Sequence, residues 1–554
     1  MQMTMTEALD STMPGAVDFG EGLVTFELYA PNKRRVELIS VPIGQEIVTH
    51  DMEDRGGGLW AMAMNLPPGK CEYRFRLDDE IVIADPYAQE IRREVGDPTP
   101  WAVVDVGRPV YFWKNEGWRR PAMREMIIYE LHVGDFTPEG TFTGALNRLD
   151  YLKERGINAI EFMPLYERSE DDYWGYMPAY FLAVRNSFGT IMELIELVDE
   201  CHARDIAVIL DLVLAHTGKD HPFFAMYPYD ESPWYGAGLG EPNQFGLPML
   251  DFTKGPTNSF VRDVQAYWMN VVHVDGFRYD YLAGIGAGGD KGLPYLMKTA
   301  RDIRPEAYAI GECIPEDPDL VNNSGLDGVW HTRSRLALRA LLCETQVNPY
   351  DWNDFETCIR AFDPSTQGYA QPSFMVNYLE CHDDERIIRL LRDAGFDDTA
   401  TGLKAGLAAT VLMTMPGEPM IYHGQEFGEE TAKSPGPNPL QWDKLRSELG
   451  GGLASHYARM CKLRRSRVSL RERNISFPVI DSHAKVAVVN RWWGQADQVV
   501  VVLNFSNHLQ VIDVPMPQRG RWHELFTGQI MQIKYSVETE LSPFSAGIYI
   551  IGVS

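Results

Sequence analysis

The chain has 554 residues, of which 45% are hydrophobic and 11% aromatic, so it can form several folded domains and is not a disordered protein. Its 51 basic and 78 acidic residues leave a net charge of −27, which would repel nucleic acid over most of the surface but would not repel a neutral substrate. The first 20 residues contain no lysine or arginine, unlike a targeting peptide, and the most apolar stretch, 405–415, is shorter than the ~20 residues that a membrane span needs. We expect a cytoplasmic protein without nucleic-acid or membrane partners.

Short β-rich runs separated by turn residues fill the first part of the chain. The runs are 23–29, 36–40, 59–66 and 72–77. They predict an N-terminal β-sandwich over 1–108. Trp60, Tyr73 and Phe75 in these runs are candidates for a sugar-binding face, but aromatic residues on sandwich strands more often lie in the core, and we expect the core.

From 109 to 467, apolar strand-like runs alternate with helical patterns, which indicates βα units around a parallel sheet. The predicted strands are 126–132, 159–164, 206–213, 275–280, 307–313, 327–330, 374–379 and 419–423. The predicted helices are 144–155, 191–204, 259–272, 293–303, a short piece after 317, 333–342, 402–413 and 452–465. Eight repeats favour a closed (β/α)8 barrel over an open sheet.

Two further segments complete the predicted organisation. The connection 215–256 is too long and too rich in glycine, proline and aromatic residues for a simple loop, and it predicts a small subdomain over the mouth of the barrel. The β pattern returns in 486–493, 498–505 and 548–553 and predicts a second β-sandwich over 468–554. The predicted fold class is therefore α/β, a (β/α)8 TIM barrel flanked by N-terminal and C-terminal β-sandwich domains.

Four acidic residues lie at or near the ends of predicted barrel strands, namely Asp211, Asp280, Glu312 and Asp383. Barrel enzymes carry their catalytic groups at that end, so these carboxylates are expected to surround one mouth. Like charges that close cannot all stay ionised, so one carboxyl should be held towards its protonated form while Arg278 keeps another as an anion. An acid beside an anionic nucleophile is suited to glycoside cleavage, and in retaining enzymes the two carboxyls lie ~5–5.5 Å apart and a covalent glycosyl-enzyme forms.

Two histidines, His216 and His382, adjoin these strand ends and would offer hydrogen bonds to sugar hydroxyls. A metal-binding Asp/His cluster is the alternative, but the chain has no H-x-H or H-E-x-x-H spacing, so no metal ligand is assigned. The seven cysteines are dispersed and form no C-x-x-C pair. We interpret Cys313 and Cys381, which adjoin the acids, as buried thiols and not as nucleophiles.

Aromatic residues form the second part of a sugar site, because sugar faces bury against rings while hydroxyls find polar partners. Candidates in or beside the predicted mouth loops are Trp174, Tyr176, Trp234, Tyr235, Tyr281 and Trp330. Some of these belong to the core. We select Trp174 and Tyr176 as substrate-binding candidates.

Several motifs occur in a characteristic order along the chain. They are Ile128-Tyr129-Glu130-Leu131-His132-Val133-Gly134, Trp174-Gly175-Tyr176, 211–216, Gly276-Phe277-Arg278-Tyr279-Asp280, Gly311-Glu312 and His382-Asp383. Together they resemble the α-amylase superfamily, glycoside hydrolase family 13. The resemblance implies that Asp280 is the nucleophile with Arg278 as its partner. It also implies that Glu312 is the general acid/base and that Asp383 stabilises the transition state.

The same resemblance assigns residues around the attacked glucose. It implies that His216, His382 and Tyr176 line its subsite and that Asp211 supports the floor. The chain departs from the family pattern at Ala215, where the family usually has an asparagine that is often a calcium ligand. No calcium site is expected there, and no cofactor is expected.

The N-terminal part carries a second resemblance. Segments 67–70, 73–75 and 84–87 are similar to the family 48 carbohydrate-binding module, which accompanies glycogen branching enzymes, isoamylases and maltooligosyltrehalose trehalohydrolases. A further departure is Cys381, where the superfamily commonly has asparagine or serine, and this change is expected to alter the polarity around the attacked sugar.

These observations lead to one main hypothesis and three alternatives. The main hypothesis is a retaining α-glucan hydrolase that cleaves α-1,4 bonds of starch, glycogen or maltooligosaccharides. A branching enzyme or other glucanotransferase, and a maltooligosyltrehalose trehalohydrolase, are the alternatives with the same chemistry. Segments 186–190 and 198–202 look like branching enzymes, whereas 311–313 and 420–424, nearer the acids, look like amylase-type hydrolases. A non-catalytic glucan-binding scaffold is disfavoured because all three acids are present.

Overall fold

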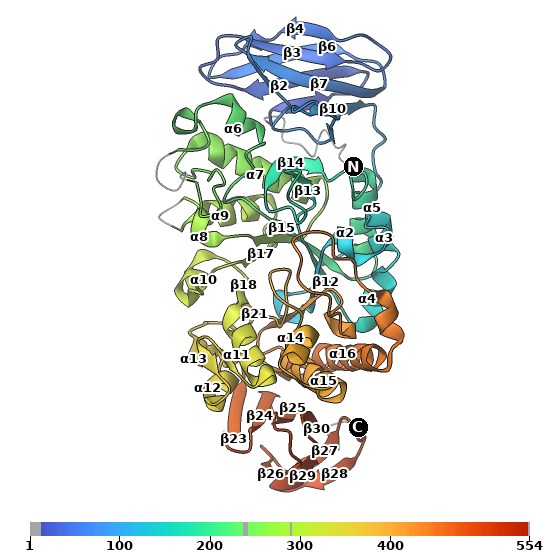
Figure 1. Cartoon of the computed structure of the whole chain (residues 1–554), viewed down its shortest axis with the longest axis vertical. Helices are drawn as coiled ribbons and strands as arrows, with labels where there is room; N and C mark the ends of the chain where they lie inside the picture. The colour runs from blue at the N-terminus through green and yellow to red at the C-terminus, as the bar shows by residue number, and fades with distance from the viewer. Residues whose placement is uncertain (1–12, 237–241, 288–290, 552–554) are drawn as a thin grey trace.

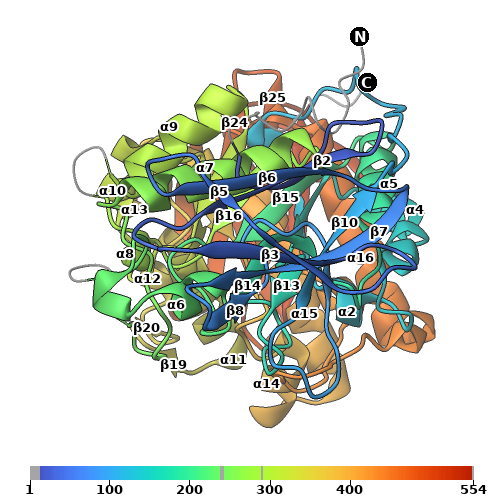
Figure 2. The same cartoon turned by 90° about the horizontal axis from the view of Figure 1, so that it is seen from above.

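The computed structural model describes residues 13–236, 242–287 and 291–551. Three parts follow one another along the long axis of the molecule, with N-terminal sheets at one end, a barrel in the middle and C-terminal sheets at the other end (Figure 1). Seen from the N-terminal end, the first sheets lie across the barrel (Figure 2). Within the described residues, no helix is both long and apolar enough to span a membrane.

The N-terminal part consists of two antiparallel sheets that share one core. The first sheet contains β1 (Gly15–Asp18), β2 (Leu23–Tyr29), β6 (Leu59–Asn65) and β5 (Glu53–Asp54), in that spatial order. The second contains β4 (Val48–Asp51), β3 (Val36–Val41), β7 (Gly69–Leu77), β10 (Trp101–Val106) and β9 (Ile91–Arg92), with β8 (Ile81–Ile83) beside β7. Phe26 and Tyr73 pack edge to face across the two sheets, with ring centroids 4.9 Å apart. Trp60, Tyr73 and Phe75 are buried, so the core interpretation of these rings is confirmed.

Eight parallel strands close into a barrel in the middle part, and the predicted (β/α)8 fold is confirmed. The strands are β11 (Ile128–Leu131), β12 (Ala159–Phe162), β15 (Ala207–Leu212), β16 (Gly276–Tyr279), β17 (Tyr308–Gly311), β18 (Gly328–His331), β21 (Met375–Asn377) and β22 (Glu418–Tyr422). Every residue in these strands is buried, as expected for a parallel sheet covered by helices. The register places Asp211 beside Arg278, so acidic and basic side chains of adjacent strands lie at the same level.

Helices between the strands pack outside the barrel. The main ones are α3 (Phe142–Leu146), α4 (Leu149–Arg155), α5 (Ile191–His202), α7 (Gly255–Asn270), α9 (Leu293–Ile303), α10 (Pro318–Ser324), α11 (Thr332–Cys343), α15 (Asp398–Thr414) and α16 (Glu448–Ser466). The prediction of one helix over 144–155 was wrong, because the chain forms α3 and α4 there. Helix α16 begins before the predicted start at 452 and includes the glycines at 450–452, because the Ser447 hydroxyl accepts a hydrogen bond from Gly450 N and caps the helix.

The sequence patterns did not reveal the hairpin of β13 (Tyr166–Arg168) and β14 (Pro178–Val184), nor helix α14 (Ile387–Asp393). Every residue of β14 is buried, as in the barrel strands, but β14 pairs antiparallel with β13 and lies outside the barrel. The hairpin loop carries Trp174 and Tyr176 to the barrel mouth. The predicted insertion at 215–256 contains α6 (Pro222–Met226) and a short 3-10 helix (Tyr229–Glu231), while residues 237–241 lie outside the described part.

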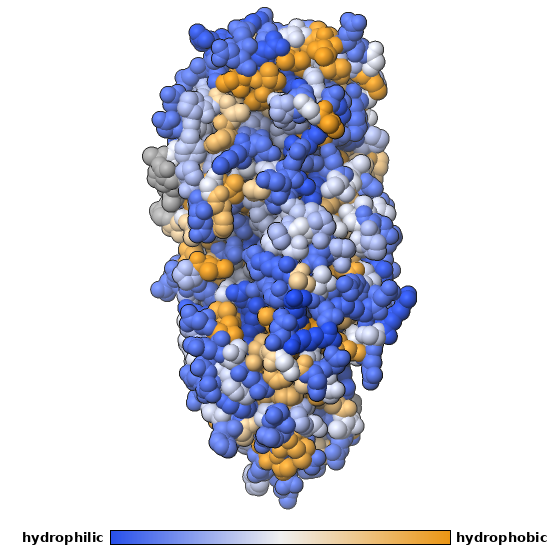
Figure 3. Space-filling view, viewed as in Figure 1, coloured by the Kyte–Doolittle hydropathy of each residue, from blue (hydrophilic) through white to orange (hydrophobic). Residues whose placement is uncertain are grey.

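The C-terminal part is again composed of β-sheets. Its larger sheet has the order β23 (Ile475–Asp481), β24 (Val486–Trp493), β25 (Asp497–Asn504), β30 (Ser545–Ile551), β27 (Gly520–Glu524) and β28 (Ile530–Ile533), and its smaller sheet pairs β26 (Gln510–Pro515) with β29 (Ser536–Leu541). The predicted strand 548–553 corresponds to β30, although its last two residues lie outside the described part. The face in Figure 3 is mainly hydrophilic, with apolar patches towards both ends of the molecule.

Candidate active site

Asp280 and Glu312, from the ends of neighbouring strands β16 and β17, share one guanidinium. Arg278 is fully buried on β16, and its Nη1 donates to Asp280 Oδ1 at 2.8 Å. Its Nη2 lies 3.1 Å from Glu312 Oε2, which also accepts a hydrogen bond from Tyr281 N at 3.0 Å. The two predicted catalytic acids are therefore held together, with Asp280 mostly buried and Glu312 partly exposed.

Asp211 joins the same cluster from strand β15. Both of its carboxylate oxygens accept hydrogen bonds from Arg278 Nη1, at 2.8 and 2.9 Å. The Tyr176 hydroxyl donates to Asp211 Oδ2 at 2.6 Å. The Trp330 ring centroid lies 4.2 Å from Arg278 Cζ. These contacts fix the guanidinium between an aromatic ring and three carboxyl groups.

The charges in this cluster do not balance. Burial raises the pKa of Asp280 well above its ordinary value against the opposing charge of Arg278, and the nearby Glu312 and Asp211 raise it further. Burial also raises the pKa of Asp211, opposed by Arg278. One guanidinium faces three carboxyl groups, two of them buried, so burial and mutual repulsion both favour a proton held within the cluster.

Asp383 follows strand β21 and is the most exposed of the acids, with 49% of its side chain accessible. His382 Nε2 lies 3.5 Å from its Oδ2 and Lys433 Nζ 3.6 Å from its Oδ1. The charge of His382 lowers the pKa of Asp383, and the charge of Lys433 lowers it further, whereas burial acts in the opposite direction. Although burial disfavours the imidazolium, Asp383 and Glu130 together raise the pKa of His382 to about 9. Near neutral pH, Asp383 is therefore an anion beside a histidinium.

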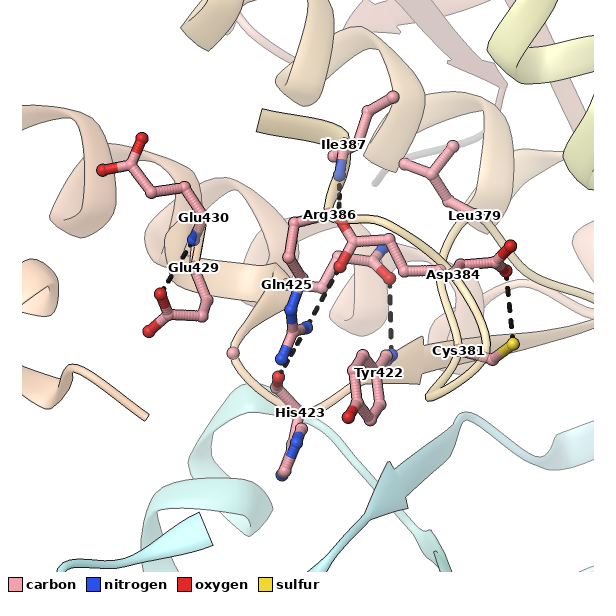
Figure 4. Close-up of polar contacts among 12 residues, drawn as sticks. Leu379, Cys381, Asp384, Arg386, Ile387, Tyr422, His423, Gln425, Glu429 and Glu430 are labelled. Carbon is pink, nitrogen blue, oxygen red and sulfur yellow. Dashed lines mark hydrogen bonds and ion pairs between the residues drawn. The ribbon is translucent and has the colours of Figure 1, made fainter. Parts of the chain in front are cut away.

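Hydrogen bonds on both sides of Asp383 hold the loop that carries it. Arg386 donates to Glu380 Oε2 at 3.1 Å. The Cys381 thiol donates to Asp384 Oδ2 at 3.2 Å (Figure 4). Burial raises the pKa of the Cys381 thiol well above its ordinary value, so this cysteine is an unreactive part of the loop. The interpretation of Cys381 as a buried thiol agrees with this contact.

The hairpin loop brings Trp174 and Tyr176 to the same place. Asp172 shapes this loop, because its carboxylate accepts hydrogen bonds from the backbone N–H groups of Trp174, Gly175 and Met177. The Tyr176 ring stacks on His382 with centroids 4.8 Å apart, and Trp174 meets His382 edge-on at 5.4 Å. Both rings are partly exposed, which leaves surface for a ligand.

Three of the other aromatic candidates belong to the core. Trp234, Tyr235 and Trp330 are at most 2% exposed, whereas Tyr281, next to Asp280, is partly exposed. His216 does not contact the acids directly. Its Nε2 lies 2.8 Å from the Tyr176 carbonyl and donates to it, so His216 positions the backbone of Tyr176. Its proposed contact with sugar hydroxyls stays a prediction.

A family model agrees with this arrangement of acids around a barrel mouth. The model of the α-amylase catalytic domain matches residues 109–235 and 242–462. The chain belongs to the α-amylase family, glycoside hydrolase family 13. A second model, carbohydrate-binding module 48 (isoamylase N-terminal domain), matches residues 14–88. Both resemblances drawn from the sequence motifs are thereby confirmed.

Known proteins of this α-amylase family align with most of the chain. A malto-oligosyltrehalose trehalohydrolase of Saccharolobus solfataricus is 28% identical over 439 residues, 74% of this chain and 74% of that protein. A 1,4-α-glucan branching enzyme of Nitrosomonas europaea is 26% identical over 561 residues, 90% of this chain and 74% of that protein. The structure of a pullulanase from Anoxybacillus sp. LM18-11 complexed with maltotriose superposes with a TM-score of 0.80 at 19% identity, covering 99% of this chain and 87% of that one. At this identity, the last comparison supports the fold alone.

Two glutamates inside the α-amylase barrel were given no role by the sequence reasoning, although Glu130 lies in one of the family motifs. Glu130 lies on β11, and its Oε1 is 2.6 Å from His382 Nδ1. Glu161 on β12 is buried, and neither of its carboxyl oxygens has a hydrogen-bond partner in the described structure. Burial raises the pKa of Glu161 well above its ordinary value, and the charge of Asp211 adds to this. The sequence did contain a signal for both residues, since each is a glutamate within an otherwise apolar strand. A glutamate is rarely buried unless it is paired or neutral, so its presence in such a strand marks a special environment.

The contact between Glu130 and His382 predicts a pH effect. Glu130→Gln removes a negative charge beside His382, so the pKa of His382 is expected to fall below its present value of about 9. The histidinium is present below that pKa and is lost as the pH rises through it. The basic limb of the pH profile of kcat/KM should therefore move to lower pH.

Glu161→Gln is the matched control for this experiment. It makes the same substitution in a barrel glutamate whose raised pKa keeps it protonated, and it makes no hydrogen bond to His382 in the described structure. Its basic limb should coincide with that of the wild type. A Glu130→Gln profile that overlays the wild-type profile would show that Glu130 does not hold the charge on His382.

Proposed function

We propose that this protein is a retaining glycosidase that hydrolyses α-1,4-glucosidic bonds of starch, glycogen or maltooligosaccharides. The observation that carries the proposal is that Asp280 and Glu312 both contact the guanidinium of Arg278. The anionic Asp383 lies beside the same mouth of the barrel. A solvent-accessible pair of aromatic rings, Trp174 and Tyr176, adds a surface suited to the faces of a sugar. Membership of the α-amylase family supports the same chemistry.

Each acid has a separate part in the proposed reaction. Asp280 attacks the anomeric carbon while Glu312 gives its proton to the leaving glycosidic oxygen, so the C–O bond breaks and a covalent glycosyl-enzyme forms. Glu312 then removes a proton from water as the water oxygen attacks the same carbon and releases Asp280. Arg278 favours the anionic form of Asp280 before the attack, and Asp383 stabilises the oxocarbenium-like charge between the two steps.

Release of trehalose from maltooligosyltrehalose is the second candidate function. The supporting observation is that relatives named malto-oligosyltrehalose trehalohydrolase align with about three quarters of this chain or more, including the one from Saccharolobus solfataricus. The bond-breaking residues would be the same. The difference would lie in the loops that accept the trehalose end of the substrate.

The products from amylose and from maltooligosyltrehalose test these proposals side by side. For the α-1,4 hydrolase, reducing ends should increase in step with the loss of iodine colour from amylose. Free trehalose from maltooligosyltrehalose, with amylose left nearly intact, would favour the second candidate. Loss of iodine colour with few new reducing ends would instead indicate chain transfer, as in a branching enzyme, and would overturn the hydrolase proposal.

We also propose that catalysis needs no calcium or other cofactor. At the position where the family often has a calcium-binding asparagine, Ala215 has no side-chain ligand, and its carbonyl oxygen already accepts a hydrogen bond from Leu250 N at 3.0 Å. The residues at this position do not fit a calcium ion. Treatment with EDTA is expected to leave kcat and Tm unchanged. An activity loss that added calcium restores would contradict this prediction.

A further inference from the structure

A groove separate from the candidate active site lies between helices α15 and α16 and the C-terminal sheets. It encloses a volume of about 900 Å³ and shares no lining residue with the candidate active site. This volume falls within the ~300–1,000 Å³ of typical small-molecule sites. Its floor is formed by apolar residues of both helices, including Leu407 and Leu453.

Three glycines on the helices keep this groove open. A Cβ on Gly452 would meet no atom within 4 Å, and a Cβ on Gly406 would lie 4.0 Å from His456. For Gly402 the nearest atom, in Leu449, would be at an ordinary contact distance of 3.6 Å. Glycine weakens a helix interior. Neither packing nor backbone conformation requires glycine at these three positions, so we look for their role in the open space beside the helices. They leave room for a ligand against the two helices.

The walls of the groove have the two surfaces that a sugar chain needs. His456 and Phe526, both partly exposed, line the groove with nearly parallel rings whose centroids are 5.9 Å apart. Polar groups such as Thr399 and Ser447 also line it. Pyranose rings bury their faces against aromatic and aliphatic groups and direct their hydroxyls to polar ones.

The charged groups of the groove favour a neutral ligand. Arg392 is paired with Glu430 and with Asp398, the latter at 2.9 Å. Lys444 lies 3.0 Å from Glu430 and also pairs with Glu429. Both of these lining cations already have carboxylate partners, so an anionic ligand such as a fatty acid or a phosphate would have to displace an ion pair. A neutral polyol would not.

We propose that this groove is a second, non-catalytic binding site for a segment of α-glucan chain. The proposal rests on the proposed α-glucan function, because it takes its ligand class from that substrate. A second site of this kind would hold polymeric substrate on the enzyme and would matter little for short oligosaccharides.

Calorimetric titration of the full-length Glu312→Gln variant with maltoheptaose tests the groove. Two binding events are expected, one at the active site and one at the groove. Adding Gly406→Leu and Gly452→Leu fills the groove while raising helix propensity, so the fold should persist and one event should remain. Ser455→Leu, on the exposed side of α16, is the matched control and should retain both events.

The catalytically competent background gives an independent readout. Gly406→Leu with Gly452→Leu should raise KM for amylose several-fold and leave kcat/KM for maltotetraose unchanged. A single event in Glu312→Gln, or a second event that survives the filled groove, would overturn the groove proposal while leaving the proposed function intact. No binding of maltoheptaose, together with no hydrolysis by the wild type, would overturn both.

Discussion

Replacing Asp280 with asparagine is expected to lower kcat on maltoheptaose by a factor of roughly 10⁴–10⁶, because the amide cannot form the glycosyl-enzyme. The substitution keeps the shape of the side chain, and its hydrogen bond from Arg278 can be accepted by the amide oxygen. Steady-state hydrolysis measures the loss, and binding of maltoheptaose checks that the site remains formed. Wild-type turnover by Asp280→Asn on every glucan tested would remove the catalytic assignment.

Glu312→Gln provides the contrast that separates the two acids. It is expected to lower kcat on maltoheptaose by roughly 10²–10⁴, the usual contribution of a general acid. With α-maltosyl fluoride, whose leaving group needs no protonation, the first step should stay fast in Glu312→Gln but not in Asp280→Asn. Equal losses of both variants on this donor would show that the roles are wrongly assigned.

Replacing Arg278 with leucine is expected to have the largest effect on stability. The fully buried guanidinium contacts Asp211, Asp280 and Glu312, so its removal leaves buried carboxyl groups without a counter-charge. Breaking a buried ion pair in this way costs about 3–5 kcal/mol. Urea-induced unfolding followed by tryptophan fluorescence measures the change. Activity should be lost as well, because Asp280 would lose the guanidinium whose charge opposes the rise of its pKa.

Two further variants make the Arg278 experiment interpretable. Arg360→Leu removes a partly exposed arginine whose ion pair is with Glu356 and whose guanidinium lies 5.4 Å from the Phe477 ring, and it should cost no more than about 1 kcal/mol. Adding Asp211→Asn to Arg278→Leu should recover part of the lost stability, because one uncompensated carboxylate disappears. Equal destabilisation by Arg278→Leu and Arg360→Leu would contradict the view that the guanidinium neutralises the cluster.

The sequence allowed the barrel and the positions of the acids to be predicted from local patterns. Buried parallel strands appear as short apolar runs, and all eight were found in this way. Since the carboxyl ends of barrel strands meet at one mouth, the strand order alone predicts that Asp280, Glu312 and Asp383 lie together. The hairpin strand β14 is a buried apolar run of the same kind, and only the structure shows that it pairs with β13 outside the barrel.

Residue identity and order along the chain therefore determined the fold class, the family and the set of acids. Only the tertiary structure decided which charges those acids carry and what supports them. Glu130 reaches His382 across 252 positions of sequence, and Lys433 reaches Asp383 across 50. Such contacts depend on strand order and loop packing, and the pKa of each group follows from burial and from neighbours that are distant in sequence. Neither the burial of a group nor the identity of its distant neighbours can be read from a local sequence pattern.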